Sequence, residues 1–199
     1  DENKASSVSI TVRNNLVYSS YLNQIKVFGR NVTNPLFKDN FVGLKYSILS
    51  LQSKNKFLAS KMIEIVAKDS DKKQLIEIHN RPNYVKYIKN TTKSKITLFF
   101  HNDPLQMNGS SSLEERLYLL NNVDCIVFNS NWSKNRFLIN IDIPQNKFNF
   151  HVIYQSASKI KVNFNNKKKI ISFVGKLNTA KGYDLFGKAI LKILNKFPE

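Results

Sequence analysis

The stretch Lys95-Ile96-Thr97-Leu98-Phe99-Phe100-His101-Asn102-Asp103-Pro104 decides the fold of this 199-residue chain. Its first six residues are rich in β-branched and aromatic side chains, which predicts a strand over 95–100. The strand ends in a histidine, an amide and a carboxylate, and Pro104 then turns the chain away. In open parallel sheets, ligands bind beyond the carboxyl ends of the strands, so this polar exit is a candidate site.

The same pattern of strand and helix continues on both sides of this stretch. Apolar periodicity predicts strands at 8–12, 25–28, 74–78, 125–128 and 148–153, and helices at 54–68, 83–90, 113–121 and 131–139. Strands that alternate with helices at this spacing indicate βαβ units. The predicted fold is therefore α/β, with a Rossmann-like parallel sheet covered by helices on both faces.

A second unit is predicted to begin near residue 170. Residues 155–169 are polar and rich in Lys and Asn, so we expect a first domain over 1–155, a linker over 156–169, and the incomplete start of a second domain over 170–199. There an apolar run over 170–174 predicts a strand, Gly175 a turn, and the later apolar stripe a helix. Such a turn gathers backbone N–H groups and the positive end of a helix dipole, which suits phosphate.

The loop of this unit resembles a known family. Val174-Gly175-Lys176-Leu177 and the pair Lys181-Gly182 are similar to the start of the second domain of GT-B glycosyltransferases, in the retaining family 4. In that family the two basic positions bind the diphosphate of a nucleotide-sugar donor. The resemblance implies that the donor is held by Gly175, Lys176, Lys181 and Gly182.

Two other interpretations of this loop exist. It is a near miss for the Walker A motif, because Ala180 replaces the second glycine and Gly182 replaces the Ser or Thr that would hold Mg²⁺. It could also be an ordinary strand-to-helix connection whose lysines are only solvated.

The resemblance extends less specifically to 98–104 and 124–138. In family 4 a histidine at the matching strand exit reaches towards the donor sugar, which implies catalytic roles for His101 and Asp103. From the residues alone, both could instead close a turn ahead of Pro104. His79 is expected to pack at its strand end, and Ser130 is explained as a helix N-cap.

The resemblance implies transfer of a sugar from a nucleotide-diphosphate sugar to an acceptor, with retention and with no metal or cofactor required. The expected acceptor is a cell-envelope glycan or lipid. The expected location is cytoplasmic, and the basic charge is compatible with peripheral contact with an anionic inner membrane face. The paired glutamates of the family would lie later in the second domain, so we expect these 199 residues to be a fragment that is inactive alone.

Charge supports an alternative. The net charge of +17 would suit a non-enzymatic binder of nucleic acid or another polyanion. Only five of the 31 basic residues are arginine, the residue that reads bases best, and the lysines are scattered, so no specific nucleic acid is expected. A phosphate-binding α/β protein of another enzyme family is a third possibility.

Cysteine and histidine usage limits other chemistry. Cys125 is the single cysteine, so no internal disulfide can form, and its place in an apolar run predicts a buried, inert thiol. No two histidines have helical metal-ligand spacing, so no metal site is predicted. No apolar run approaches the ~20 residues of a membrane span.

Overall fold

The computed structural model describes residues 5–47, 49–69, 73–142, 144, 147–156, 161 and 170–197. The chain divides into two compact units, Asp1–Ala157 and Ser158–Glu199. The first unit contains every described strand, and the second contains the last helix of the chain.

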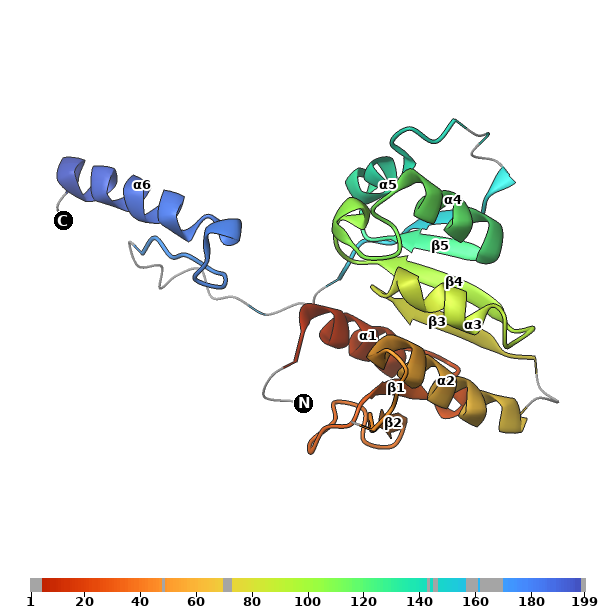
Figure 1. Ribbon diagram of the computed structural model, residues 1–199. Helices are drawn as coiled ribbons and strands as arrows, with labels where there is room; N and C mark the ends of the chain where they lie inside the picture. The colour runs from red at the N-terminus through yellow and green to blue at the C-terminus, as the bar shows by residue number, and fades with distance from the viewer. Residues whose placement is uncertain are drawn as a thin grey trace. The chain divides into compact units, whose positions relative to one another are not determined.

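A four-stranded parallel sheet forms the centre of the first unit (Figure 1). Its order is β3-β4-β5-β6, with bounds Leu75–His79, Lys95–Phe100, Cys125–Phe128 and Phe150–Val152. His79 pairs with Phe99, and Phe100 pairs with Phe128. The register therefore places the exits of neighbouring strands side by side, which confirms the predicted α/β parallel sheet.

Four helices cover one face of this sheet (Figure 1). They are α2 (Lys54–Val66), α3 (Val85–Ile88), α4 (Leu113–Asn122) and α5 (Asn131–Leu138). The buried core that they share with the strands includes Ile96, Leu98, Phe100, Phe128 and Phe137. Ile96, Leu98 and Phe100 alternate along β4, as a pleated strand requires.

Local capping explains where two of these helices begin. Ser112 and Glu115 form a reciprocal capping box at the start of α4. Ser130 Oγ accepts a hydrogen bond from the backbone N–H of Ser133 at 3.1 Å, so Ser130 caps α5 as predicted.

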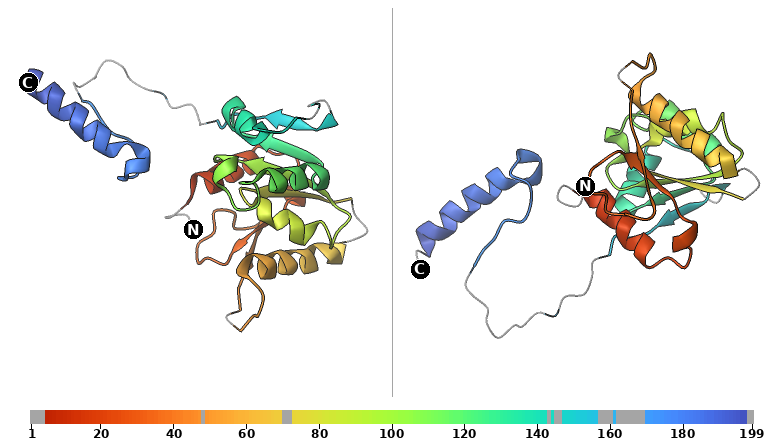
Figure 2. Two further views of the ribbon diagram at one scale, coloured as in Figure 1. Left: turned by 45° about the horizontal axis from the view of Figure 1, so that its top comes forward. Right: turned by 90° about the horizontal axis from the view of Figure 1, so that it is seen from below.

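The opposite face of the sheet is less covered. Figure 2 (right) shows α1 (Ser7–Val17) on the other side of the strands from α2. Leu75 and Ile153 remain 59% and 57% exposed. Helices were predicted on both faces of the sheet. Among the described residues, four helices lie on one face and α1 on the other, so the two faces are covered unevenly.

The prediction of a strand over 8–12 is wrong, because these residues belong to α1. Val8, Ile10 and Val12 do alternate with polar residues, but five alternating positions are too few to exclude a helix. Ser6 Oγ accepts from the backbone N–H of Ser9 at 3.1 Å and caps the helix.

A second, small sheet was predicted only in part. It pairs β1 (Val27–Arg30) with β2 (Phe41–Leu44) in parallel, and β2 was not predicted. The Asn40 side-chain nitrogen donates to the carbonyls of Leu22 and Ile25 at 2.8 and 2.9 Å, which ties the two segments together.

The second unit contains α6 (Tyr183–Lys196), as predicted, preceded by a 3₁₀ turn at Thr179–Lys181. The predicted strand over 170–174 does not form. A strand needs a neighbour to receive its backbone hydrogen bonds, and the described part of this unit offers none. The apolar stripe of α6 is correspondingly exposed, at 66% for Leu185 and 52% for Leu194.

Candidate functional site

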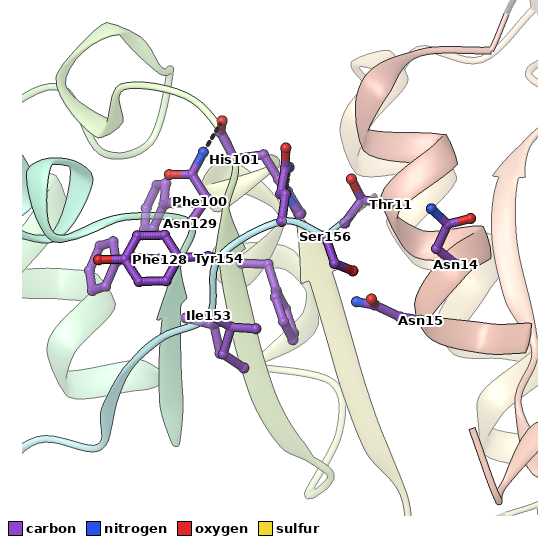
Figure 3. A pocket seen from close by; sticks show the side chains of 13 residues that line it. Thr11, Asn14, Asn15, Phe100, His101, Phe128, Asn129, Ile153, Tyr154 and Ser156 are labelled. Atoms are coloured by element: carbon purple, nitrogen blue, oxygen red, sulfur yellow. Dashed lines mark hydrogen bonds between the residues drawn. The ribbon is translucent and has the colours of Figure 1, made fainter. Parts of the chain in front are cut away.

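A hollow lies at the carboxyl edge of the main sheet, where β4, β5 and β6 meet α1 (Figure 3). It encloses about 420 Å³, including the part open to solvent. Its polar lining includes Thr11, Asn14, Asn15, His101, Asn129 and Gln155. None of the described residues that line it is an Asp, Glu, Lys or Arg, so the described lining offers hydrogen bonds without formal charge.

Neighbouring strand exits clamp the backbone of His101. Its N–H donates to Asn80 Oδ1 at 2.8 Å, and its carbonyl accepts from Asn129 Nδ2 at 2.8 Å (Figure 3). Asn80 is buried and adopts a left-handed backbone with φ of 55°, which Asn tolerates better than most residues. Two asparagines therefore fix the direction in which His101 leaves β4.

The imidazole of His101 is hydrogen-bonded at both nitrogens. Its Nε2 lies 3.0 Å from Nδ1 of His79, and its Nδ1 lies 3.1 Å from Nε2 of Gln155. His79 in turn stacks on the Phe99 ring, with a centroid distance of 4.4 Å. His79 thus packs at its strand end, as expected, and also contacts the candidate catalytic histidine.

His101 is held neutral at physiological pH. Burial, and then the neighbouring charge of His79, lower the pKa of His101 from 6.5 to about 4. At neutral pH this ring can accept and donate hydrogen bonds but carries no positive charge. The arrangement suits positioning of a hydroxyl group better than binding of an anion.

Asp103 is held by a different set of partners. Its Oδ2 lies 3.0 Å from Arg136 Nη2, and its Oδ1 accepts from the backbone N–H of Leu105 at 3.0 Å. Burial by itself would raise the pKa of the Asp103 carboxyl, but these hydrogen bonds and the Arg136 charge lower it below its usual value. Asp103 does not line the hollow, so its predicted catalytic role remains a prediction.

The four residues predicted to hold the donor lie in the second unit. Lys176 and Lys181 are both exposed, and a Cβ placed on Gly175 would lie 3.8 Å from the Cβ of Lys181. Gly182 has φ of 74° and begins α6 without a side-chain cap. The loop therefore brings Gly175 close to Lys181 beside an uncapped helix start, and its ligand remains a prediction.

Asp184 lies in the first turn of α6, where a carboxylate is favoured by the helix dipole. Its Oδ1 is buried and has no hydrogen-bond partner among the described residues. An anion bound at this helix start would have to accommodate that carboxylate.

Arg81 follows the exit of β3, and the remaining sequence predictions concern Cys125, metals and membranes. Arg81 is exposed and donates to the Asn80 carbonyl at 2.9 Å. Cys125 is partly rather than fully buried, and burial raises the pKa of its thiol. Within the described residues, no cluster of three or more His, Cys, Asp or Glu could hold a metal ion, and no helix could span a membrane.

The sequence predicted His101 as a candidate site residue, but it did not predict the residues that hydrogen-bond to His101. Asn80 and Asn129 each follow a strand directly, which was a usable signal. Gln155 had no such signal, because it lies in the polar segment that was assigned to the domain boundary.

No model of a known protein family matches the chain, and no curated protein matches it. The fold and the hollow define a class: an α/β protein with a Rossmann-like parallel sheet and an uncharged, hydrogen-bonding site at its carboxyl edge.

Proposed function

We propose that this protein is a glycosyltransferase of GT-B type, similar to the retaining family 4, which moves a sugar from a nucleotide-diphosphate sugar to an acceptor. The observation that carries the proposal is the uncharged hollow at the carboxyl edge, with a neutral His101 in its wall. In open α/β sheets this edge is where ligands bind.

The lining of the hollow suits a neutral sugar. Each hydroxyl of a sugar donates one hydrogen bond and accepts others, so it needs both kinds of partner. The amides of Asn14 and Asn15 offer a donor and an acceptor each, whereas the Asn129 amide is already bonded to the His101 carbonyl and the Ser133 hydroxyl. Aromatic side chains such as Phe99 supply apolar surface for the C–H faces of a sugar ring.

The donor's diphosphate would be held in the second unit. Lys176 and Lys181 provide fixed positive charge, and the uncapped start of α6 provides backbone N–H groups. Positive groups placed where negative charge develops stabilise a departing diphosphate. In this scheme His101 positions a sugar hydroxyl in the first unit, and the lysines of the second unit stabilise the negative charge of the leaving diphosphate.

The acceptor is proposed to be a cell-envelope glycan or a lipid-linked saccharide. The net charge of +17 would favour a protein that works beside anionic lipid headgroups. A cytoplasmic protein with peripheral contact at the inner membrane face fits this arrangement.

A polyanion binder remains the second candidate, because of the same net charge. It requires basic side chains around its ligand, whereas the lining of the hollow has none. It also requires affinity to fall steeply with salt. Binding to DNA or RNA at low salt that is lost in 0.5 M NaCl would favour this candidate, and no binding at low salt would reject it.

Donor binding to the full-length protein tests the proposal. A panel of nucleotide-diphosphate sugars is titrated by calorimetry against the wild type, Lys181→Ala and Lys192→Ala. Lys192 is the matched control, because it is an exposed lysine further along α6. We expect one donor to bind. Its affinity should be reduced about 10-fold or more in Lys181→Ala and should be unchanged in Lys192→Ala. Equal affinities in all three proteins would reject the assignment of the loop.

A further inference from the structure

A row of polar side chains, joined by one ion-pair contact and two hydrogen bonds, crosses the face of the sheet opposite α2. Glu77 Oε2 lies 3.4 Å from His79 Nε2, and His79 Nδ1 lies 3.0 Å from His101 Nε2. His101 Nδ1 then lies 3.1 Å from Gln155 Nε2. The Glu77 side chain is 51% exposed and that of His79 only 16%. The row therefore leads from a solvated carboxylate, through two imidazoles, to the wall of the hollow.

The acidic end of the row sets the direction of its protons. A carboxylate only accepts hydrogen bonds, so Glu77 favours a proton on His79 Nε2. A neutral imidazole donates at one nitrogen and accepts at the other. His79 Nδ1 is then the acceptor, and His101 Nε2 is the donor. His101 Nδ1 is left with a free lone pair, which meets the amide N–H of Gln155.

Protonation of His79 would reverse this order. A doubly protonated His79 donates from Nδ1, so the proton of His101 would move to its own Nδ1. The amide of Gln155 would then have to present its oxygen instead of its nitrogen. The first arrangement is therefore the one in which the His79 ring is neutral.

The surroundings of the His101 ring add no competing charge. Asp103 is paired with Arg136, and its carboxylate does not line the hollow. Among the described residues, the polar groups that face the hollow from α1, from the exit of β5 and from the segment after β6 include no Asp, Glu, Lys or Arg: they are Thr11, Asn14, Asn15, Asn129, Tyr154, Gln155 and Ser156. The titratable groups that act on the ring are therefore those of the row, His79 directly and Glu77 through it.

We propose that Glu77 and His79 are positioning residues that hold His101 as its Nε2–H tautomer, so that a ligand hydroxyl donates to His101 Nδ1 in place of Gln155. The proposal rests on the proposed function only in taking the hydroxyl to be that of a sugar. Gln155 is exposed and comes from the segment that follows β6, so its amide can give way to a ligand. A hydroxyl can donate to the lone pair, whereas a sulfate dianion has only acceptors.

Imidazole nitrogen NMR tests the tautomer directly. The chain has three histidines, so single substitutions assign every signal in ¹⁵N-histidine-labelled protein. At pH 7.5 we expect His101 to show a protonated Nε2 and an unprotonated Nδ1. Glu77→Ala should shift both rings of the row towards a mixture of tautomers, and Glu77→Gln, which keeps an acceptor oxygen, should restore the wild-type pattern. His151→Gln is the control that should leave His101 unchanged.

Ligand titration tests the second part of the proposal, that a ligand hydroxyl donates to His101 Nδ1. Glucose is the hydroxyl-bearing probe, and inorganic sulfate, whose oxygens only accept, is the comparison. We expect glucose, and not sulfate, to shift His101 Nδ1, with binding about 2- to 10-fold weaker in Glu77→Ala, because the tautomer that accepts the hydrogen bond is no longer fixed.

Each outcome decides the proposal. A proton on His101 Nδ1 at pH 7.5 would overturn the tautomer, and the absence of a glucose-dependent shift at His101 would overturn the ligand assignment. Retained amide dispersion in the proton–nitrogen spectrum establishes that each variant is folded. A correct tautomer and glucose response, together with no transfer from any nucleotide sugar, would reject the proposed function alone.

Discussion

The neutral state of His101 makes the stability of the protein depend on pH in a defined way. The folded pKa of His101 is about 4, whereas an unfolded histidine titrates near 6.5. Between these values the unfolded chain binds more protons than the folded one, so stability rises with pH. The contribution of His101 is fully present above pH 6.5 and is lost as the pH falls from there towards 4.

The size of this effect follows from the two pKa values. Between pH 6.5 and pH 5.0 the unfolded ring becomes protonated while the folded ring stays neutral. Because one pKa unit corresponds to about 1.4 kcal/mol, the free energy of unfolding should fall by about 2 kcal/mol from pH 7.5 to pH 5.0 through His101 alone. In His101→Gln this part of the pH dependence should disappear.

Urea unfolding at pH 7.5 and pH 5.0 measures the difference. Wild type and His101→Gln are compared with His151→Gln, which removes an exposed histidine outside the hollow. If His101→Gln loses as much stability between the two pH values as the wild type does, the ring is not held neutral. The account of the hollow as an uncharged site would then fail.

Three further predictions concern the framework of the site. Phe137→Ala should lower the free energy of unfolding by about 3–5 kcal/mol, because the ring is fully buried against two other phenylalanines; urea denaturation would show it, and a loss under 1 kcal/mol would contradict the described core. Asp103→Ala should cost about 1–2 kcal/mol by removing the Arg136 pair and the hydrogen bond to the Leu105 N–H, while the ¹⁵N signals of His101 stay unchanged; a shifted His101 spectrum would show that the two side chains act together. Gly109→Ala should lower the thermal midpoint, since Gly109 has φ of 94° and a Cβ would lie 2.4 Å from the Asn83 backbone nitrogen; an unchanged midpoint would mean that this turn relaxes freely.

The central strands could be predicted closely because their signals are local. β4 and β5 coincide with their predicted ranges, since each is a short apolar run closed by polar turn residues. The strand expected over 8–12 was wrong because five alternating residues do not distinguish a strand from α1. The strand expected over 170–174 was wrong because a strand depends on a neighbour that local sequence cannot supply.

The candidate site was predictable in one residue and not in its neighbours. His101 could be identified because it ends a strong strand. Its contacts with His79 and Gln155 depend on strand register and on the path of the chain after β6. Sequence places these residues 22 and 54 positions from His101, and only the folded sheet brings them together.

The central claim is that a neutral His101 positions the sugar that the protein transfers. Donor consumption and nucleoside diphosphate release by the full-length protein, measured by mass spectrometry with a panel of nucleotide sugars and cell-envelope lipid extract, test it most directly. The account predicts that one donor is consumed and that a matching glycosylated product appears. The rate of donor consumption should be reduced about 10-fold or more in His101→Ala. Consumption of no donor, or equal rates in the two proteins, would contradict it.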